Sequence, residues 1–451
     1  MTDTHWPDLT QDTVELLQAM IRNECVNDGT PESGEEVRTS DLLRTYLEGA
    51  GVEVETFDAA PGRRSLVARL EGTDPTAPSV CLMGHTDVVP VSPDGWSRDP
   101  FGGDLVDGEV WGRGAIDMLN LTASMAVAFR HLARSGFRPR GDLIYFAVAD
   151  EEAGGRWGAE WMLDHHYDAA GADYVVTEMG GWRAPGSGPP EIALTAGEKG
   201  LAWRRLHVRG TPAHGSMPYG ADNALVTAAE VIRRLADYRP AAHLGELWSD
   251  MVQSSGLEAE TVEALLSADT LWDGLQRIDD PGTAKRLHAC AHTTFSPNVV
   301  HGGTKTNVIP DHVTIDVDIR VVPGDDADAV NAHLGRALND LLRNVEVEAV
   351  FDDQASFTPT DTPMWRCLTD LTRRVYPDAR LVPSMTTGAT DARFYRERGA
   401  VAYGAGLFSP GMTFETFANR FHGHDERIDV ESLRLTTEMW LGLAETFWSY
   451  V

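Results

Sequence analysis

In Ser79-Val-Cys-Leu-Met-Gly-His-Thr-Asp-Val-Val-Pro90, an apolar run leads directly into a histidine and an aspartate two residues apart. The run Val80 to Met83 predicts a buried strand. His85 and Asp87 follow at its C-terminal end, the edge where ligands bind in open α/β sheets. Alternate residues of an extended chain point the same way, so both side chains can share one side. The pair fits a metal ligand with its orienting carboxylate, and it equally fits a core histidine satisfied by a nearby aspartate.

Acidic side chains recur where further predicted segments begin or end. Asp117 stands just before a predicted helix, where a helix N-terminal residue is the simpler interpretation of it alone. Another apolar run ends in Asp150-Glu-Glu152, and neighbouring carboxylates raise one another's pKa unless a cation lies between them. A third apolar run ends in Glu178. The repetition favours a buried cation site over a set of solvated acidic loops.

The bulk composition excludes several classes of protein. The chain has 451 residues, which predicts two or three domains. Its 69 acidic and 38 basic residues give a net charge of −31, which argues against nucleic acid or an anionic membrane surface as a partner. The four cysteines are scattered without a CxxC pattern, as in a reducing compartment. With no signal-peptide pattern and no apolar run long enough to span a bilayer, we expect a cytoplasmic protein.

The order of predicted elements indicates a divided chain. Helices alternate with strands up to Glu178, which predicts an α/β fold with a mixed, mainly parallel sheet flanked by helices. After a Pro/Gly-rich break the order becomes β-α-β-β-α-β, that of a ferredoxin-like α+β unit. We therefore predict one domain made of residues 1–196 and 356–451, interrupted by an inserted α+β domain, 197–355. Within the latter, residues 239–291 form a helical insert of unassigned role.

The donor types point to a metal hydrolase. Imidazole and carboxylate together are zinc-type ligands. Two metals that share one carboxylate need about five protein ligands and one free carboxylate as base. Histidines and acidic residues at the predicted strand ends supply that number.

Taken together, the motifs resemble the M20 family of co-catalytic metallopeptidases and amidohydrolases. That family contains carboxypeptidase G2-like enzymes, dipeptidases, aminoacylases and succinyl-diaminopimelate desuccinylase, and the resemblance runs from about residue 10 to the end. The motifs are Gly84-His-Thr-Asp-Val-Val-Pro90, Gly112-Arg-Gly-Ala-Ile-Asp-Met118, Asp150-Glu-Glu152, Glu178, Gly215-Ser-Met-Pro218 after His214, Thr306-Asn-Val-Ile-Pro310 and His422-Gly-His-Asp-Glu426. The resemblance implies a zinc-peptidase-like fold, with 197–355 as a lid or dimerisation domain.

The resemblance also implies a role for each matching residue. His85 and Glu178 would bind one metal, Glu152 and His422 the other, and Asp117 would bridge the two. Asp87 would orient His85, and Glu151 would be the general base. The family spacing His-x-x-Asn/Asp-Glu selects His422 over His424. The two divalent ions implied are zinc, with cobalt or manganese as alternatives.

The inserted domain carries further residues that match the family. In dimeric relatives the counterpart of His214 reaches a partner subunit's site and polarises the scissile carbonyl. Asn307, Arg320 and the Gly388 loop resemble substrate-contacting residues, although Arg320 also fits a surface strand position. A homodimer through the inserted domain is implied. Whether His214 acts in its own chain or in the partner stays open, because insert 239–291 is of the kind that lengthens the lid or replaces the dimer interface in some relatives.

The resemblance implies a hydrolase of amide bonds. We expect cleavage of a dipeptide or short peptide with a free carboxylate, and as the alternative hydrolysis of an N-acyl amino acid, as by an aminoacylase or desuccinylase. A non-catalytic metal-binding scaffold is the contrasting hypothesis. The retention of Glu151 beside five ligand positions argues against it, because a decayed site usually loses its base.

Overall fold

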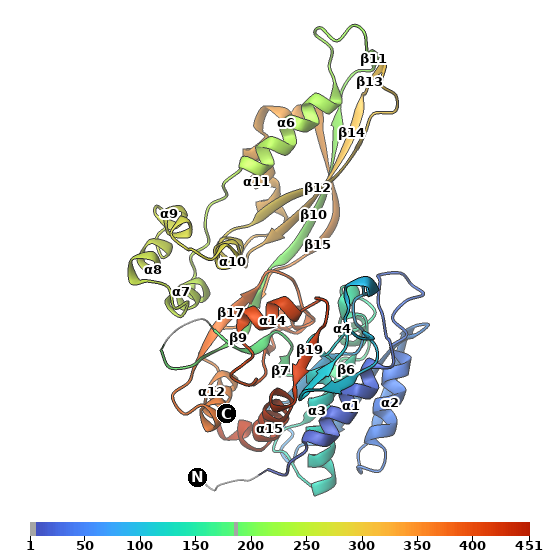
Figure 1. Cartoon of the computed structure of the whole chain (residues 1–451), viewed down its shortest axis with the longest axis vertical. Helices are drawn as coiled ribbons and strands as arrows, with labels where there is room; N and C mark the ends of the chain where they lie inside the picture. Colours follow the sequence, from blue (N-terminus) through green and yellow to red (C-terminus); the bar gives the residue numbers. More distant parts are fainter. Residues whose placement is uncertain (1–5, 185–187) are drawn as a thin grey trace.

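The computed structural model describes residues 6–184 and 188–451, and its largest feature is a ten-stranded sheet (Figure 1). The strand order is β1-β2-β6-β3-β7-β18-β9-β16, with β17 and β8 also paired to β9. The strands are β1 (Val54–Ala60), β2 (Arg63–Leu70), β3 (Val80–His85), β6 (Leu143–Val148), β7 (Tyr174–Thr177), β8 (Gly180–Arg183), β9 (Glu191–Glu198), β16 (Ser356–Phe357), β17 (Arg380–Thr386) and β18 (Val401–Gly404).

The centre of this sheet is parallel and fully covered. Strands β6, β3, β7 and β18 run parallel in that order, β17 runs parallel to β9, and the remaining pairs are antiparallel. Every residue of β3 and β6 is buried, as expected for apolar strands with helices on both faces. The mainly parallel α/β sheet predicted from the sequence is thus confirmed.

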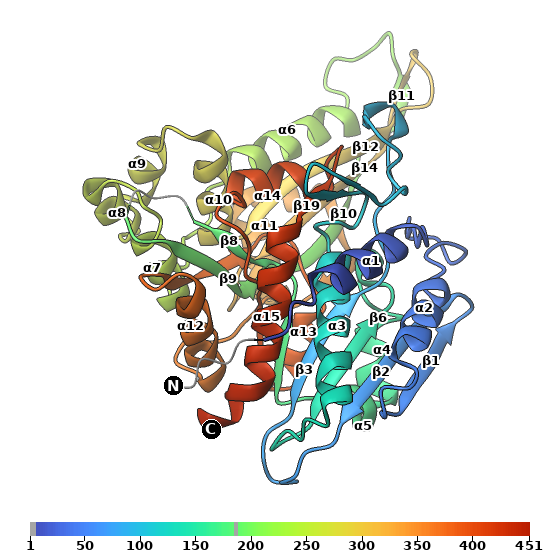
Figure 2. The ribbon, with the colours of Figure 1, turned by 60° about the horizontal axis from the view of Figure 1, so that its bottom comes forward.

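Helices divide the sheet's two faces between them. Val80 and Leu82 point into the cluster with α1 (Thr10–Ile21), α3 (Leu119–Ser135) and α15 (Val430–Thr446), which lie side by side in Figure 2. Cys81 and Met83 point into the opposite cluster with α4 (Ala159–His165) and α13 (Ala392–Glu397). The remaining helices of this part are α2 (Val37–Leu47), α5 (Tyr167–Ala170), α12 (Pro363–Val375) and α14 (Phe414–Arg420).

A second sheet is built entirely from antiparallel strands. Its order is β12 (Thr294–Gly302), β14 (His312–Val321), β10 (Gly200–Arg209), β15 (Val345–Asp353). Burial alternates strictly along β14, because one face packs under α6 (Ala224–Asp237) and α11 (Ala327–Leu338) in a hydrophobic cluster of its own. The element order is the β-α-β-β-α-β predicted. The limits 1–196, 197–355 and 356–451 stay a prediction.

The two sheets are joined by neighbouring crossings of the chain. Strand β9 passes into β10 at Lys199, and β15 returns into β16. The crossings lie next to each other, since Leu201 pairs with Asp353 in one sheet and Glu198 with Ser356 in the other. At the opposite end of the second sheet, the small pair β11 (Ala213–His214) and β13 (Val308–Ile309) forms its far tip (Figure 1).

The helical insert packs on the large sheet, although its sequence lies inside the second unit. It comprises α7 (Glu246–Gln253), α8 (Ala259–Leu265), α9 (Leu271–Gln276) and α10 (Pro281–Ala291), and its buried residues join the main hydrophobic cluster. The Nζ of Lys199, at the first crossing, donates to the carbonyl oxygens of Ala289 (2.8 Å) and His292 (2.7 Å). The end of α10 is thereby fastened to the junction between the sheets.

The segment 91–114 contains two short strands. Its β4 (Asp104–Val106) and β5 (Glu109–Trp111) form a three-stranded sheet with β19 (Arg427–Asp429) from the C-terminal part. This pairing depends on a strand more than 300 residues away, which local pattern cannot reveal. Among the described residues, no helix has the length and apolarity needed to cross a membrane.

Candidate metal centre

His85 ends β3 with its ring fully buried and its two nitrogens in different surroundings. Nδ1 lies 3.0 Å from the backbone oxygen of Asp87 and 3.7 Å from its carboxylate Oδ1. A carbonyl can only accept, so Nδ1 carries the proton and Nε2 is left as the ligand atom. Nε2 lies 3.1 Å from Oδ1 of Asp117. Asp87, two residues after the end of β3, therefore holds the imidazole ring mainly through its backbone oxygen.

Asp117 sits between two histidines. Its Oδ1 faces His85, and its Oδ2 lies 2.7 Å from Nε2 of His422. The residue comes at the end of the loop before α3, where Ile116 and Asp117 donate their backbone N–H groups to one buried carboxylate, that of Glu426 (2.7 and 3.1 Å). This carboxylate also accepts from Arg113 Nη1 at 2.6 Å. The loop's shape thus depends on a residue near the C-terminus.

Three further carboxylates complete the cluster. Glu151 and Glu152 start a short turn after β6, and Glu178 follows β7. Oxygens of Glu151 and Glu178 each lie 4.0 Å from Nε2 of His85, and an oxygen of Glu152 lies 3.5 Å from Nε2 of His422. Potential ligand atoms of His85, Asp117 and Glu152 fall within 4.8 Å of one another, as do those of His85, Glu151 and Glu178.

Burial and crowding make these carboxylates hard to ionise together. Burial, assisted by neighbouring negative charges, raises the pKa of Glu151 to about 7 and that of Glu152 to about 8. Burial raises the pKa of Glu178 well above its ordinary value as well. Burial alone would raise the pKa of Asp117, but hydrogen bonds from His422 and His85 lower it. Such a set carries its negative charge at neutral pH only if cations balance it.

The donor set fits divalent metal ions. Oε1 of Glu152 is buried and has no hydrogen-bond partner among the described residues. Unsatisfied buried oxygens are rare, and a cation is one of the few partners that can satisfy a carboxylate. Two imidazoles with several carboxylates match zinc and related ions in ligand type. The residues present therefore suit the metals that the sequence implied.

The structure distinguishes His422 from His424, the two candidate ligands of the motif His422-Gly-His-Asp-Glu426. His422 points at Asp117, whereas the ring of His424 lies against Gly95, so closely that a methyl group there would come within 2.2 Å of it. His424 thus packs on the loop 91–114 and not in the cluster.

A buried polar network behind the cluster was missed by sequence reasoning. Oδ2 of Asp87 accepts from Asn27 Nδ2 (2.8 Å) and from the backbone N–H of Glu152 (3.1 Å). Asn27 in turn accepts from Arg63 (3.1 Å), which pairs with Glu36 at 2.6 Å. All of these side chains are buried. Because Asp87 bonds to the backbone of Glu152, it ties β3 to the loop after β6 as well as to His85.

The residues expected to contact substrate are dispersed. Gly388 lines a pocket of about 360 Å³ beside the cluster, together with Glu151 and Glu178. His214 and Asn307 lie at the far tip of the second sheet, where the N–H of Gly215 donates to the Asn307 oxygen (Figure 1). Arg320 is paired with Asp318 at 2.8 Å near the junction of the sheets. The structure brings only Gly388 of this group to the cluster, and the roles of the others stay predictions.

The pocket beside the cluster has an aromatic wall. Phe414, Phe417 and Phe421 line it along one side of α14 and its C-terminal end. The rings continue to the candidate ligand, because Phe421 stacks on His422 with ring centroids 4.5 Å apart. The cluster therefore opens on a surface suited to an apolar part of a ligand.

Comparison with known proteins identifies a family for the chain. The model of peptidase family M20/M25/M40 matches residues 81–446. Succinyl-diaminopimelate desuccinylase of Parvibaculum lavamentivorans is 28% identical over 442 residues, covering 95% of this chain and 94% of the relative. Pig (Sus scrofa) aminoacylase-1 is 29% identical over 397 residues, covering 86% and 84%. The crystal structure of the M20 family metallo-carboxypeptidase Sso-CP2 from Sulfolobus solfataricus superposes with a TM-score of 0.72 at 17% identity, covering 97% of this chain and 99% of that one.

Proposed function

Since this chain belongs to peptidase family M20/M25/M40, we propose that it hydrolyses the amide bond of a short peptide or N-acyl amino acid with a free carboxylate. Membership of the family makes it a hydrolase of C–N bonds. The observation that carries the finer proposal is the cluster of four acidic residues and two histidines at the ends of β3, β6 and β7 and in the loops around them.

The metal ligands proposed are those at the cluster's centre. His85, Glu178 and Asp117 would hold one ion, and Glu152, His422 and again Asp117 the other. The position of Asp117, with one oxygen towards each histidine, supports its role as the shared ligand. Zinc is the first choice, with cobalt or manganese as alternatives. When bound, the two ions would acidify water and polarise the scissile carbonyl.

Glu151 is the proposed general base. Its side chain is only 10% exposed and places an oxygen 4.0 Å from Nε2 of His85, and desolvation raises the pKa of Glu151 to about 7. A base with a pKa near the working pH accepts and returns a proton with similar ease. Glu151 takes a proton from the attacking water and gives it to the departing amine nitrogen as the C–N bond breaks. Asp87 keeps His85 and the backbone of Glu152 in place during these steps.

Two substrate classes are separated by experiment. A short peptide is the first candidate. An N-acyl amino acid is favoured by the aromatic wall of Phe414, Phe417 and Phe421, which suits an apolar acyl group. Zinc- or cobalt-loaded enzyme should be tested against dipeptides, N-acetyl amino acids and N-succinyl-diaminopimelate. Hydrolysis confined to one class identifies the substrate, and hydrolysis of none, despite bound metal, contradicts the proposal.

Replacing the base provides the decisive variant. Glu151→Gln is expected to retain two metal ions, measured by elemental analysis, and to lose hydrolysis. Glu160→Gln, in α4 and outside the cluster, is the matched control and should keep both. If Glu151→Gln still hydrolyses substrate, the base is another residue. Native protein that binds metal but hydrolyses no amide substrate would support the hypothesis of a non-catalytic metal-binding scaffold.

Dimerisation is proposed through the second sheet. Strand β12 is an edge strand, and Val299 and Val300 on it are exposed. Val226 on the adjacent α6 is also exposed. Unpaired edges with apolar side chains favour pairing with a second copy. Light scattering should give twice the chain mass, and Val300→Lys should give the monomer; a monomeric native chain contradicts the proposal and removes any role of His214 in a partner's site.

A further inference from the structure

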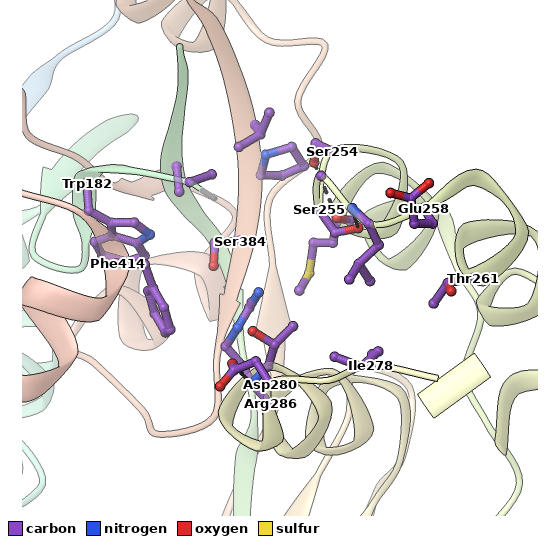
Figure 3. Close-up of a pocket in the computed structure, with 18 of the residues that line it drawn as sticks. Trp182, Ser254, Ser255, Glu258, Thr261, Ile278, Asp280, Arg286, Ser384 and Phe414 are labelled. Atoms are coloured by element: carbon purple, nitrogen blue, oxygen red, sulfur yellow. Dashed lines mark hydrogen bonds between the residues drawn. The ribbon is translucent and has the colours of Figure 1, made fainter. Parts of the chain in front are cut away.

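A cavity of roughly 330 Å³ lies between the helical insert and the large sheet (Figure 3). One wall comes from the large sheet and α14, with Trp182, Ser384 and Phe414; the opposite wall comes from the insert, with Met251, Ile278 and Arg286. Figure 3 shows Trp182 and Phe414 on one side, Ser384 in the middle, and Arg286 beside Asp280 below. The volume of this cavity is in the range of small-molecule sites in proteins.

The cavity adjoins the pocket beside the metal centre. Phe414 lines both spaces. Along β17, Ser384 lines the cavity and Thr386 the pocket, and alternate residues of a strand face the same side about 7 Å apart. A row of rings also runs between them, with centroids 4.8 Å apart for Trp182 and Phe417 and 5.5 Å for Phe417 and Phe421. The two spaces therefore share one apolar wall.

The cavity presents a cation without a counter-ion. Arg286 has no carboxylate within 4.0 Å among the described residues, and its buried Nε has no hydrogen-bond partner there. Its guanidinium is held over the ring of Phe414, with Cζ 5.1 Å from the centroid. The other arginine of the lining, Arg277, is paired with Glu260 at 2.7 Å. Only Arg286 of these two is thus available to a ligand.

The lining offers two further donors, and its three acidic residues, Glu258, Asp279 and Asp280, are exposed to solvent. The Trp182 indole N–H and the Ser384 hydroxyl make no hydrogen bond with the described residues. The carboxylate of Asp280 caps α10 by accepting from the N–H of Thr283 at 2.7 Å. Glu258, at the other end of the lining, is exposed. Apolar walls with unpaired donors suit a carbon chain that ends in a carboxylate.

We propose that this cavity is a substrate subsite that takes the distal part of the acyl group, an apolar chain ending in a carboxylate that pairs with Arg286. The inference rests on the proposed amide hydrolysis, because the cavity would extend the pocket in which the scissile amide lies. It gives the helical insert a role in substrate selection: α10 supplies the charge, and α7 with the segment after α9 supplies the apolar wall.

Chain length and end group test the proposal. The substrates are N-acyl amino acids with one amino acid and acyl chains of about six to ten carbons ending in methyl, carboxylate or ammonium, with N-acetyl as reference. The carboxylate-ended chain should have the lowest KM. Arg286→Gln should raise that KM roughly ten- to a hundredfold, as expected for loss of a charged hydrogen bond, and leave kcat and the N-acetyl substrate unchanged. Arg277→Gln, the control, should change neither.

Two further measurements separate this inference from the proposed function. Ser384→Leu, which fills the cavity from β17, should raise KM for all long chains and leave N-acetyl hydrolysis intact. Calorimetric titration with suberate, an eight-carbon dicarboxylate, into metal-loaded enzyme should show binding that Arg286→Gln weakens. If no amide is hydrolysed but suberate binding depends on Arg286, the proposed function fails and the carboxylate site stands. Preference for the ammonium-ended chain, no gain from long chains, or suberate binding unchanged by Arg286→Gln overturns the inference.

Discussion

Replacing Glu426 by glutamine tests whether the C-terminal part shapes the metal centre. The Glu426 carboxylate is fully buried and accepts from Arg113 and from the backbone of Ile116 and Asp117. Glutamine keeps an oxygen for the backbone groups but leaves the buried guanidinium of Arg113 without a charged partner. Breaking a buried pair in this way costs about 3–5 kcal/mol of unfolding free energy. At about 2 °C per kcal/mol for a large domain, the thermal midpoint should fall by roughly 6–10 °C.

The same variant should weaken metal binding, because Asp117 loses part of its support. Loss of a residue that holds a ligand typically lowers metal affinity about ten- to a hundredfold. Calorimetry of unfolding and titration of zinc into metal-free protein measure the two effects. The control is Glu431→Gln, which removes an exposed carboxylate from Arg434 and should cost less than about 1 kcal/mol. A Glu426→Gln protein that melts within 2 °C of the native one and binds zinc equally would refute the reasoning.

Three further outcomes are expected. Removing metal with a chelator should lower the thermal midpoint, because the buried carboxylates then repel one another; an unchanged midpoint would mean that the cluster holds no ion. Gly158→Ala should destabilise by about 1–3 kcal/mol in urea unfolding, since its Cβ would lie 1.7 Å from the Ala149 oxygen, whereas Gly335→Ala, with open space in α11, should stabilise by about 0.5–1 kcal/mol. Burial lowers the pKa of Lys199 to about 7 from 10.5, so the unfolded chain binds more protons between these values and stability should rise with pH across that window. The native-minus-Lys199→Met difference in unfolding free energy should show this rise, and a flat difference would contradict it.

The sequence predicted those parts of the fold that have local signals. Strands β3 and β6 were predicted correctly from the apolar run Val80–Met83 and the run before Asp150. A strand that is buried on both faces has a continuous apolar sequence and is therefore easy to recognise. Strand β17 was missed: it contains Pro383, which argues against a strand. The structure accommodates this proline because β9 is the one strand among the described residues with which β17 pairs. Strand β5 was missed because its partner β19 lies far along the chain.

The residues of the candidate site also fall into those that the sequence predicts and those that it does not. His85, Asp117 and Glu178 stand directly at element boundaries, where pattern and family motif coincide. Asn27 and Arg63 have no local signal, since each is one polar residue in a polar region and acquires a role only through contacts formed on folding. The contact of Nδ1 of His85 with the backbone oxygen of Asp87 cannot be predicted from the sequence for another reason. Every residue has a backbone oxygen, so no residue type marks the one that makes this contact.

The adjacent crossings between the sheets have a consequence for how the gene can change. Because the chain leaves and re-enters the large sheet at Glu198 and Ser356, which are hydrogen-bonded neighbours, everything between them could be exchanged or deleted with only a short join. Connectivity thus permits recombination of the whole intervening region as one cassette. Packing opposes it, because the cassette includes α7 to α10, whose apolar residues cover the large sheet. A deletion that retains residues 239–291 should therefore yield a more soluble protein than one that removes the complete region.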